Sequence, residues 1–223
     1  MSEPIDVEVW ADVACPWCYI GTHRLRAGIQ AFRRDPRAPD VRVRHRAFQL
    51  APDLPADHAV PERESLAART GADLEQVDAM LGQVATAARS AGLAFDVEHA
   101  LAANTARAHA LLQYAAAHGV AAPLWDELFA AHFRDGLDVG ATDVLVAAAE
   151  RTGLPREAAA AALDDPRYAA AVASDIELAL RLGVTGVPFT VFGGLFAVSG
   201  AQDAAVFTDA LRQVVAERQE TGA

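Results

Sequence analysis

The sequence has 223 residues, of which 52% are apolar and 22% are charged, and this is enough to bury a sizeable hydrophobic core. Its net charge of -11, from 19 basic and 30 acidic residues, argues against nucleic acid or an anionic membrane as a partner. The chain contains no lysine, which excludes catalysis by a lysine amine.

Two candidate strands and a helix lie near the N-terminus. Residues 5–10 alternate apolar and polar side chains, and residues 41–48 repeat this alternation, which is typical of strands. Between them, apolar residues recur at helical spacing and predict a helix that ends near Arg34. Pro16 suits the first turn of this helix, where its missing N–H costs nothing. The segment therefore predicts a β-α-β unit.

The middle of the chain, roughly residues 61–183, is expected to be helical. Prolines fall near the predicted helix starts and glycines near the predicted helix ends. This placement of prolines and glycines indicates six or seven helices and no strands.

β structure returns near the C-terminus. Residues 189–192 and 195–198 have strand composition and flank Gly193-Gly194, a dipeptide typical of a two-residue hairpin turn. A final helix is expected over about residues 203–218. The chain thus predicts an α/β fold in which a helical insertion interrupts one sheet.

The number and position of the cysteines narrow the chemistry. We see no secretory signal and no apolar run of the roughly 18 residues that a membrane span needs, so we expect a cytoplasmic protein. Only two cysteines are present, Cys15 and Cys18. Because structural disulfides are uncommon in a reducing compartment, we interpret the pair as redox-active or metal-binding.

A Cys-x-x-Cys pair on the first turn of a helix is suited to thiol–disulfide exchange. Unpaired backbone N–H groups and the positive end of the helix dipole stabilise a thiolate there. Cys15 would attack a substrate sulfur to form a mixed disulfide, and Cys18 would then attack Cys15 and release the substrate. We expect Pro16 to stiffen the turn and Trp17 to form an apolar lip beside it.

Two other interpretations of the cysteines remain open. In the first, the two cysteines form half of a zinc site. The chain has no second cysteine pair and its histidines lack finger-type spacing, so we expect no metal. Two inert buried cysteines are the other. A non-catalytic chaperone or metal-binding module would use the apolar groove around Trp17, and serine at position 15 would then leave its activity unchanged.

The active-turn segment, residues 15–21 preceded by Asp12, resembles that of the DsbA-like thioredoxin superfamily, and specifically its FrnE-like cytoplasmic branch. Further segments that resemble this branch are Phe48-Gln49-Leu50, Asn104-Thr105 with Ala108-His109, and Ser199-Gly200-Ala201-Gln202.

The resemblance implies a thioredoxin-like fold, β-α-β then β-β-α around a mixed four-stranded sheet, interrupted by an all-helical insertion. Residues 1–60 and 184–223 would form the thioredoxin-like domain, and residues 61–183 the insertion. It also implies a protein disulfide oxidoreductase or isomerase that acts on protein or small-molecule thiols and disulfides without a resident cofactor. We make no prediction of oligomeric state.

Thr185-Gly186-Val187-Pro188 resembles the cis-proline loop of this family. The resemblance implies a cis Val187–Pro188 bond opposite the cysteines, with the Val187 backbone free to pair with an extended substrate. The alternative is an ordinary trans proline that opens a strand.

One position departs from better-known relatives. Thioredoxins and DsbA carry a buried acid six residues before the first cysteine, and Val9 stands there in this chain. Glu8 is expected on the opposite face of its strand. Asp12 lies closer to the thiols and is a candidate proton relay, although a helix cap or loop acid is an equal alternative.

The related kappa-class glutathione transferases suggest one more site. Ser199 and Gly200, just before the last helix, would hold a carboxylate of glutathione as substrate or reductant, or would simply cap the helix. A 2-hydroxychromene-2-carboxylate isomerase or a kappa-type transferase is the alternative enzyme. Those relatives usually carry serine at the active turn, so Cys15 and Cys18 argue against it. We interpret His109, on an apolar helix, as a core histidine.

Overall fold

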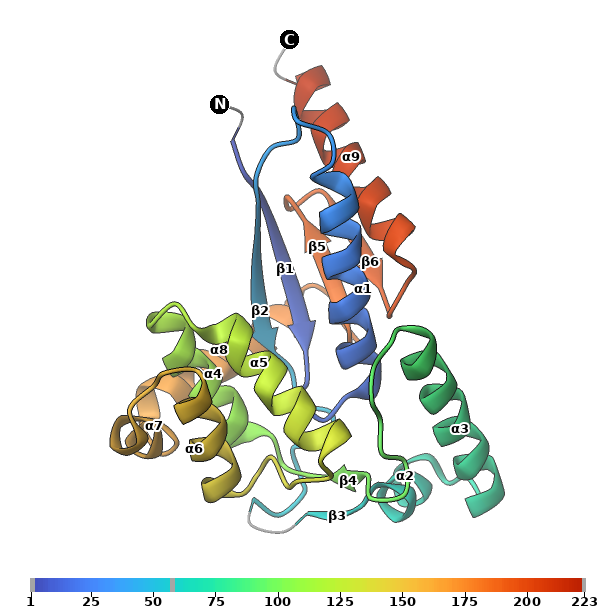
Figure 1. The fold of residues 1–223 in the computed structure, drawn as a ribbon, viewed down its shortest axis with the longest axis vertical. Helices are drawn as coiled ribbons and strands as arrows, with labels where there is room; N and C mark the ends of the chain where they lie inside the picture. The colour runs from blue at the N-terminus through green and yellow to red at the C-terminus, as the bar shows by residue number, and fades with distance from the viewer. Residues whose placement is uncertain (1–2, 57–58, 222–223) are drawn as a thin grey trace.

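A four-stranded mixed sheet organises the molecule, as expected, and its strand order is β2-β1-β5-β6. The computed structural model describes residues 3–56 and 59–221. β1 (Ile5–Ala11) is parallel to β2 (Val41–Ala47) and antiparallel to β5 (Phe189–Phe192), which pairs with β6 (Phe196–Ser199). Helices α1 (Pro16–Phe32) and α9 (Ala204–Thr221) pack together along one face of this sheet (Figure 1).

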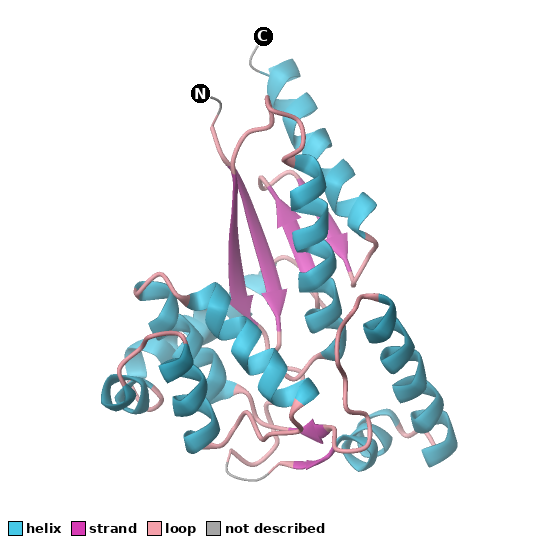
Figure 2. Cartoon of the chain, viewed as in Figure 1, coloured by secondary structure: helices cyan, strands magenta, loops and turns pink. Residues whose placement is uncertain are grey.

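The predicted helical insertion lies between β2 and β5. Its helices gather around the end of the sheet at which α1 begins (Figure 1 and Figure 2). Residues 61–183, all of them described, form α2 (Glu62–Thr70), α3 (Leu74–Ser90), α4 (Ala106–Ala117), α5 (Ala121–Phe129), a π-helical turn (Ala130–Arg134), α6 (Thr142–Arg151), α7 (Arg156–Ala162) and α8 (Pro166–Arg181).

Local sequence accounts for several helix ends in the insertion. The side chain of Asp73 accepts a hydrogen bond from Gln76 N–H at the start of α3, and Gln76 bonds back to the Asp73 backbone in a capping box. Gly71 ends α2 in the left-handed conformation, at φ 69°, which glycine adopts without strain.

The expectation that the insertion contains no strands was wrong at one point. β4 (Leu101–Ala102) pairs antiparallel with β3 (Val60–Pro61) in a two-stranded ribbon. Two residues are too few to show any alternation, so the sequence pattern could not indicate this pairing.

The β5–β6 hairpin was predicted, but with a shorter turn. Phe192 pairs with Phe196, so the connection has three residues, Gly193, Gly194 and Leu195, and the second strand begins one residue later than expected. Both glycines have positive φ, 59° and 71°, as the glycine pair suggested.

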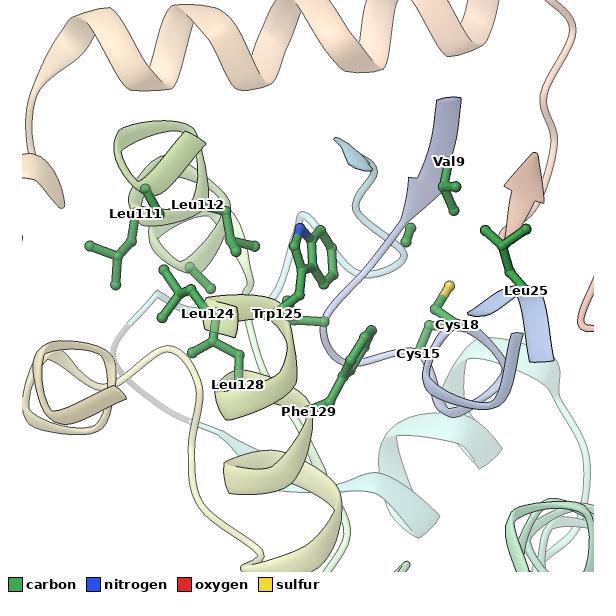
Figure 3. Close-up of a cluster of buried hydrophobic side chains, with 14 of the residues drawn as sticks. Val9, Cys15, Cys18, Leu25, Leu111, Leu112, Leu124, Trp125, Leu128 and Phe129 are labelled. Carbon is green, nitrogen blue, oxygen red and sulfur yellow. The ribbon is translucent and has the colours of Figure 1, made fainter. Parts of the chain in front are cut away.

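One continuous hydrophobic core joins the sheet to the insertion. Figure 3 shows Cys15 and Cys18 between Val9 and Leu25 on one side and Phe129, from α5, on the other. The division into residues 1–60 with 184–223 and residues 61–183 stays a prediction, and its residues 1–2, 57–58 and 222–223 lie outside the described part.

The second face of the sheet is partly covered by α8. Trp10 alternates away from Val9 and is nevertheless fully buried, because Ala179 and Val184 pack against it. This side chain helps to attach the insertion to the sheet.

Both ends of the described chain lie at the end of the sheet far from the start of α1 (Figure 1). Near the end of α9, Arg218 donates hydrogen bonds to the carbonyls of Glu3 and Pro4, at 3.0 and 3.3 Å. Among the described residues, no helix combines the length and apolarity needed to cross a membrane.

Candidate active site

Cys15 and Cys18 occupy the first turn of α1. Cys15 is the N-cap residue and Pro16 follows it at the first helical position. The Cys15 carbonyl accepts hydrogen bonds from the N–H groups of Cys18 and Tyr19, at 3.0 and 3.2 Å. Both cysteines are free thiols, and their residues are 3% and 0% exposed. The local fold thus places Cys15 toward the surface and Cys18 behind it.

A cavity of about 520 Å³ opens beside Cys15, a size suited to a small ligand or a few side chains. Its lining is mainly apolar, and Trp17, which is partly exposed, is one of the residues that line it. Helices α2 and α3 and the β4 segment supply most of the remaining wall. Because Cys15 is almost fully covered, a substrate must reach its sulfur through this cavity.

The Val187–Pro188 peptide bond is cis, in agreement with the expectation for this loop. The Cys15 thiol donates a hydrogen bond to the Val187 carbonyl, with the sulfur 3.7 Å from the oxygen. Pro188 Cγ lies only 2.9 Å from where a Cβ would sit on Gly21, so glycine at position 21 lets the loop pack closely against α1. The loop therefore lies directly opposite the cysteine turn.

Asp12 is buried beneath the cysteine turn, at 1% exposure. Its carboxylate accepts hydrogen bonds from Ala14 N–H (3.3 Å) and Leu50 N–H (2.7 Å), and His109 Nε2 lies 3.4 Å from Oδ1. Burial alone would raise the pKa of Asp12, but His109 and the Leu50 N–H outweigh it and hold the pKa below its usual value. An ionised carboxylate therefore lies inside the site.

Cys18 is the more difficult of the two thiols to ionise. Burial raises its pKa well above the usual value, and the Cys15 side chain and the Asp12 carboxylate add to this effect. Val9, where relatives carry an acid, is buried and apolar, and Figure 3 shows it beside Cys18. Glu8 points to the other face, as expected, and pairs there with Arg46.

The sequence matches the DsbA-like thioredoxin domain family over residues 6–212, nearly the whole chain. The chain belongs to this family. It is a DsbA-like disulfide oxidoreductase, and Cys15 and Cys18 are its Cys-x-x-Cys pair.

Solved structures agree with this assignment. A probable DsbA oxidoreductase from Streptomyces coelicolor is 38% identical and superposes with a TM-score of 0.89, over 96% of this chain and 91% of that one. A 2-hydroxychromene-2-carboxylate isomerase is 18% identical, with a TM-score of 0.69 over 97% and 98%. The cytosolic disulfide reductase DsbM from Pseudomonas aeruginosa is 20% identical, with a TM-score of 0.61 over 98% and 100%. The last two likenesses show the fold alone. No curated protein matches the sequence.

The DsbA-like site also contains an acid that sequence reasoning missed. Glu62, at the start of α2, lines the cavity beside Cys15 and pairs with Arg69 at 3.1 Å. Burial raises the pKa of Glu62 to about 7, with Arg69 opposing the shift and Asp12 adding to it. Only its place after Pro61 was visible in the sequence, and that indicates a helix start rather than a site.

The other expected site residues of this DsbA-like chain lie away from the cavity. Ser199 is exposed, and Gly200 N–H already donates to the Pro188 carbonyl at 2.8 Å. Neither residue lines the cavity beside Cys15. A glutathione contact here stays a prediction, and it would use the Ser199 hydroxyl. Within residues 3–56 and 59–221, no group of three or more His, Cys, Asp or Glu side chains could hold a metal ion.

Proposed function

We propose that this protein catalyses thiol–disulfide exchange with Cys15 as the nucleophile and Cys18 as the resolving cysteine. The Cys15 thiolate attacks a substrate disulfide, an S–S bond forms to the substrate, and one substrate thiolate leaves. Cys18 then attacks Cys15 and expels the second substrate thiolate, so that the substrate is reduced and the enzyme pair is oxidised. The reverse sequence oxidises a substrate dithiol. The main support is the arrangement of the two thiols, with Cys15 facing the cavity and Cys18 fully buried behind it.

Asp12 is the proposed base for the second step. Cys18 must lose its proton before it can attack, and its raised pKa keeps it a thiol near neutral pH. The ionised Asp12 carboxylate lies beneath the same turn, held by Leu50 N–H and His109. Asp12 thus takes the role that a buried acid at position 9 has in better-known relatives.

The proposed substrates are small thiols and disulfides or extended peptide segments. The covered position of Cys15 supports this, because a flat protein surface could not reach its sulfur. An extended segment would pair with the Val187 backbone, whose carbonyl already faces Cys15. Glutathione, as substrate or reductant, would contact Ser199. We place the chain in the FrnE-like branch and in the cytoplasm on the sequence resemblance alone.

The deciding experiment combines a redox titration with turnover. The wild-type pair is equilibrated in glutathione buffers, and reduction of a disulfide substrate is followed in parallel. We expect a reversible two-electron couple, no turnover for Cys15→Ser, and a trapped mixed disulfide for Cys18→Ser. Ser199→Ala is the control for glutathione, and should alter turnover with glutathione but not with an unrelated thiol. Turnover that survives in Cys15→Ser would reject the proposal in favour of the isomerase, transferase or chaperone alternatives.

A further inference from the structure

His109 uses only one of its two ring nitrogens. Nε2 lies 3.4 Å from the Asp12 carboxylate, whereas Nδ1 is buried and has no hydrogen-bond partner among the described residues. The residue is 1% exposed. A purely structural buried histidine normally has both nitrogens bonded, because an unsatisfied one costs about 1–3 kcal/mol. The second nitrogen of His109 therefore needs an explanation.

The His109 ring borders a second cavity, of about 610 Å³, which is distinct from the one beside Cys15. This rear cavity lies between β2 and helices α4 and α5 and is also lined by His45, Gln113 and Trp125. The Trp125 ring lies 5.7 Å from that of His109 and 5.1 Å from that of His45. His45 Nε2 is also buried and has no hydrogen-bond partner within the described part of the chain. Two unsatisfied imidazole nitrogens thus belong to residues around one space.

The Asp12–His109 contact connects the two cavities. Asp12 lines the cavity beside Cys15, and His109 lines the rear cavity. During the second step the substrate is bonded to Cys15 and fills the first cavity, so that a proton leaving Cys18 has no open route on that side. The rear cavity remains open to solvent.

We propose that His109 is a proton-relay residue that carries the Cys18 proton from Asp12 to solvent in the rear cavity. The inference rests on the proposed function, because it takes Cys18 as the resolving thiol. His109 does not touch the reacting sulfurs and acts through Asp12.

The steps balance in both directions. The relay alternates the His109 ring between its two tautomers, and in the reduced enzyme the proton is on Nδ1, so that Nε2 can accept. The Cys18 proton passes to an oxygen of Asp12, Asp12 gives a proton to His109 Nε2, and Nδ1 gives its own proton to solvent. The Cys18 thiolate then attacks Cys15, and the substrate leaves as a thiolate. His109 ends with its proton on Nε2. When the pair is reduced again, Nδ1 takes a proton from solvent and the same steps return one to Cys18.

The surrounding charges favour this route. Burial and Arg26 lower the pKa of His45 to about 4, so His45 adds no positive charge to the cavity at neutral pH. The titratable and charged groups around the pair come from every element packed against it. They are Cys18, Glu62 and His132 toward Asp12, His45 and Arg44 on the wall of the rear cavity, Arg26 near His45, and Arg46 and Asp175 beyond Gln113.

The test separates the two chemical steps with a chromogenic aryl disulfide. Reduced enzyme releases one coloured thiolate in a concentration-dependent first phase, when Cys15 attacks, and a second in a concentration-independent phase, when Cys18 attacks. His109→Gln keeps a donor to Asp12 but cannot carry a proton. We expect it to slow the second phase at least about tenfold and to leave the first phase unchanged. As the pH is lowered, its second phase should also begin to slow at a higher pH than in wild type, because glutamine lacks the charge through which His109 helps to lower the pKa of Asp12.

His132→Gln is the matched control. His132 is buried, the Asp12 carboxylate is among the groups that act on its pKa, and its Nδ1 lies 3.3 Å from the Leu137 carbonyl oxygen. We expect its second phase to stay within about twofold of wild type, because it has no place in the route. An equal slowing of both variants would show a general effect of core histidines and would overturn the relay.

A second variant tests the route without changing His109. Ala116 is exposed on α4 and lines the rear cavity, and Ala116→Phe should obstruct it. Ala170, exposed on α8 and lining neither cavity, gives the control Ala170→Phe. The relay requires the second phase to be slower in Ala116→Phe and unchanged in Ala170→Phe. A second phase at the wild-type rate in either His109→Gln or Ala116→Phe overturns it. Failure of the proposed function is distinct, since wild-type enzyme would then show no second phase that Cys18→Ser removes.

Discussion

Arg46 on β2 and Asp175 on α8 form an ion pair of 2.6 Å that joins the sheet to the insertion. Asp175 is buried, and its carboxylate also accepts hydrogen bonds from Ala47 N–H at 3.1 Å and from Gln113 at 2.6 Å. Its backbone carbonyl accepts the indole N–H of Trp10 at 3.0 Å. One residue of the insertion thus binds three segments of the chain.

We expect Asp175→Asn to lower the free energy of unfolding by about 3 kcal/mol, because it removes one partner of a buried pair. Urea denaturation measures this loss. Asp6→Asn is the control, since Asp6 and Arg42 form an exposed pair worth less than about 1 kcal/mol. Equal losses in the two variants would mean that the buried pair does not hold the insertion in place.

Two helical glycines should respond oppositely to alanine. A Cβ on Gly28 would lie 2.7 Å from the Ala204 carbonyl oxygen and 2.9 Å from Phe207 Cβ, so α9 must shift. A Cβ on Gly82 would meet nothing within 4 Å. We expect Gly28→Ala to destabilise the protein by about 1–3 kcal/mol and Gly82→Ala to stabilise it by about 0.5–1 kcal/mol. Thermal unfolding compares them directly, and a stable Gly28→Ala would contradict the close packing of α1 and α9.

Glu62 should give the stability a distinctive pH dependence. Its pKa in the folded protein is about 7, above the ordinary 4.5. The protonated form is therefore favoured by folding, and this contribution is present below about pH 4.5 and is lost as the pH rises through about 7. We expect Glu62→Gln to gain stability relative to wild type over this range, by about 3 kcal/mol at most. Urea titrations at several pH values measure the difference, and a constant difference would contradict the burial of the carboxyl.

Asp12→Asn tests the proposed base while preserving the shape of the side chain. We expect the second phase with the aryl disulfide to slow by about a hundredfold and the first phase to change little. Glu8→Gln is the control, because Glu8 lies on β1, just before Asp12 in the chain, but pairs with Arg46 on the other face of the sheet. Resolution at the wild-type rate in Asp12→Asn would show that another group accepts the Cys18 proton.

The fold could be predicted from the sequence wherever the signal lies in a short, continuous segment. Alternation over residues 5–10 and 41–48 marked β1 and β2, and the cysteine spacing next to Pro16 marked the start of α1. Resemblance added the cis bond at Pro188, which no periodicity indicates.

The parts of the site that escaped prediction depend on contacts between distant residues. Asp12 and His109 are 97 positions apart, so their pairing left no local pattern, and His109 resembled an ordinary core residue of an apolar helix. Glu62 was not singled out, because its position after Pro61 indicates only a helix start, and its place in the cavity wall depends on how the insertion packs. Trp10 fell on the more polar side of its strand, and only the return of α8 to the sheet explains its burial.

The contact of Arg218 with Glu3 and Pro4 brings the two ends of the described chain together, remote from the cysteine turn. A short linker could therefore join these ends without crossing the catalytic face, and new ends could be opened at Gly153, in the exposed turn between α6 and α7. Such a circular permutant would keep Cys15, Cys18, Asp12 and the cis-proline loop in place. The same geometry makes either end a suitable anchor for immobilising the protein on a solid support with its active site facing the solution.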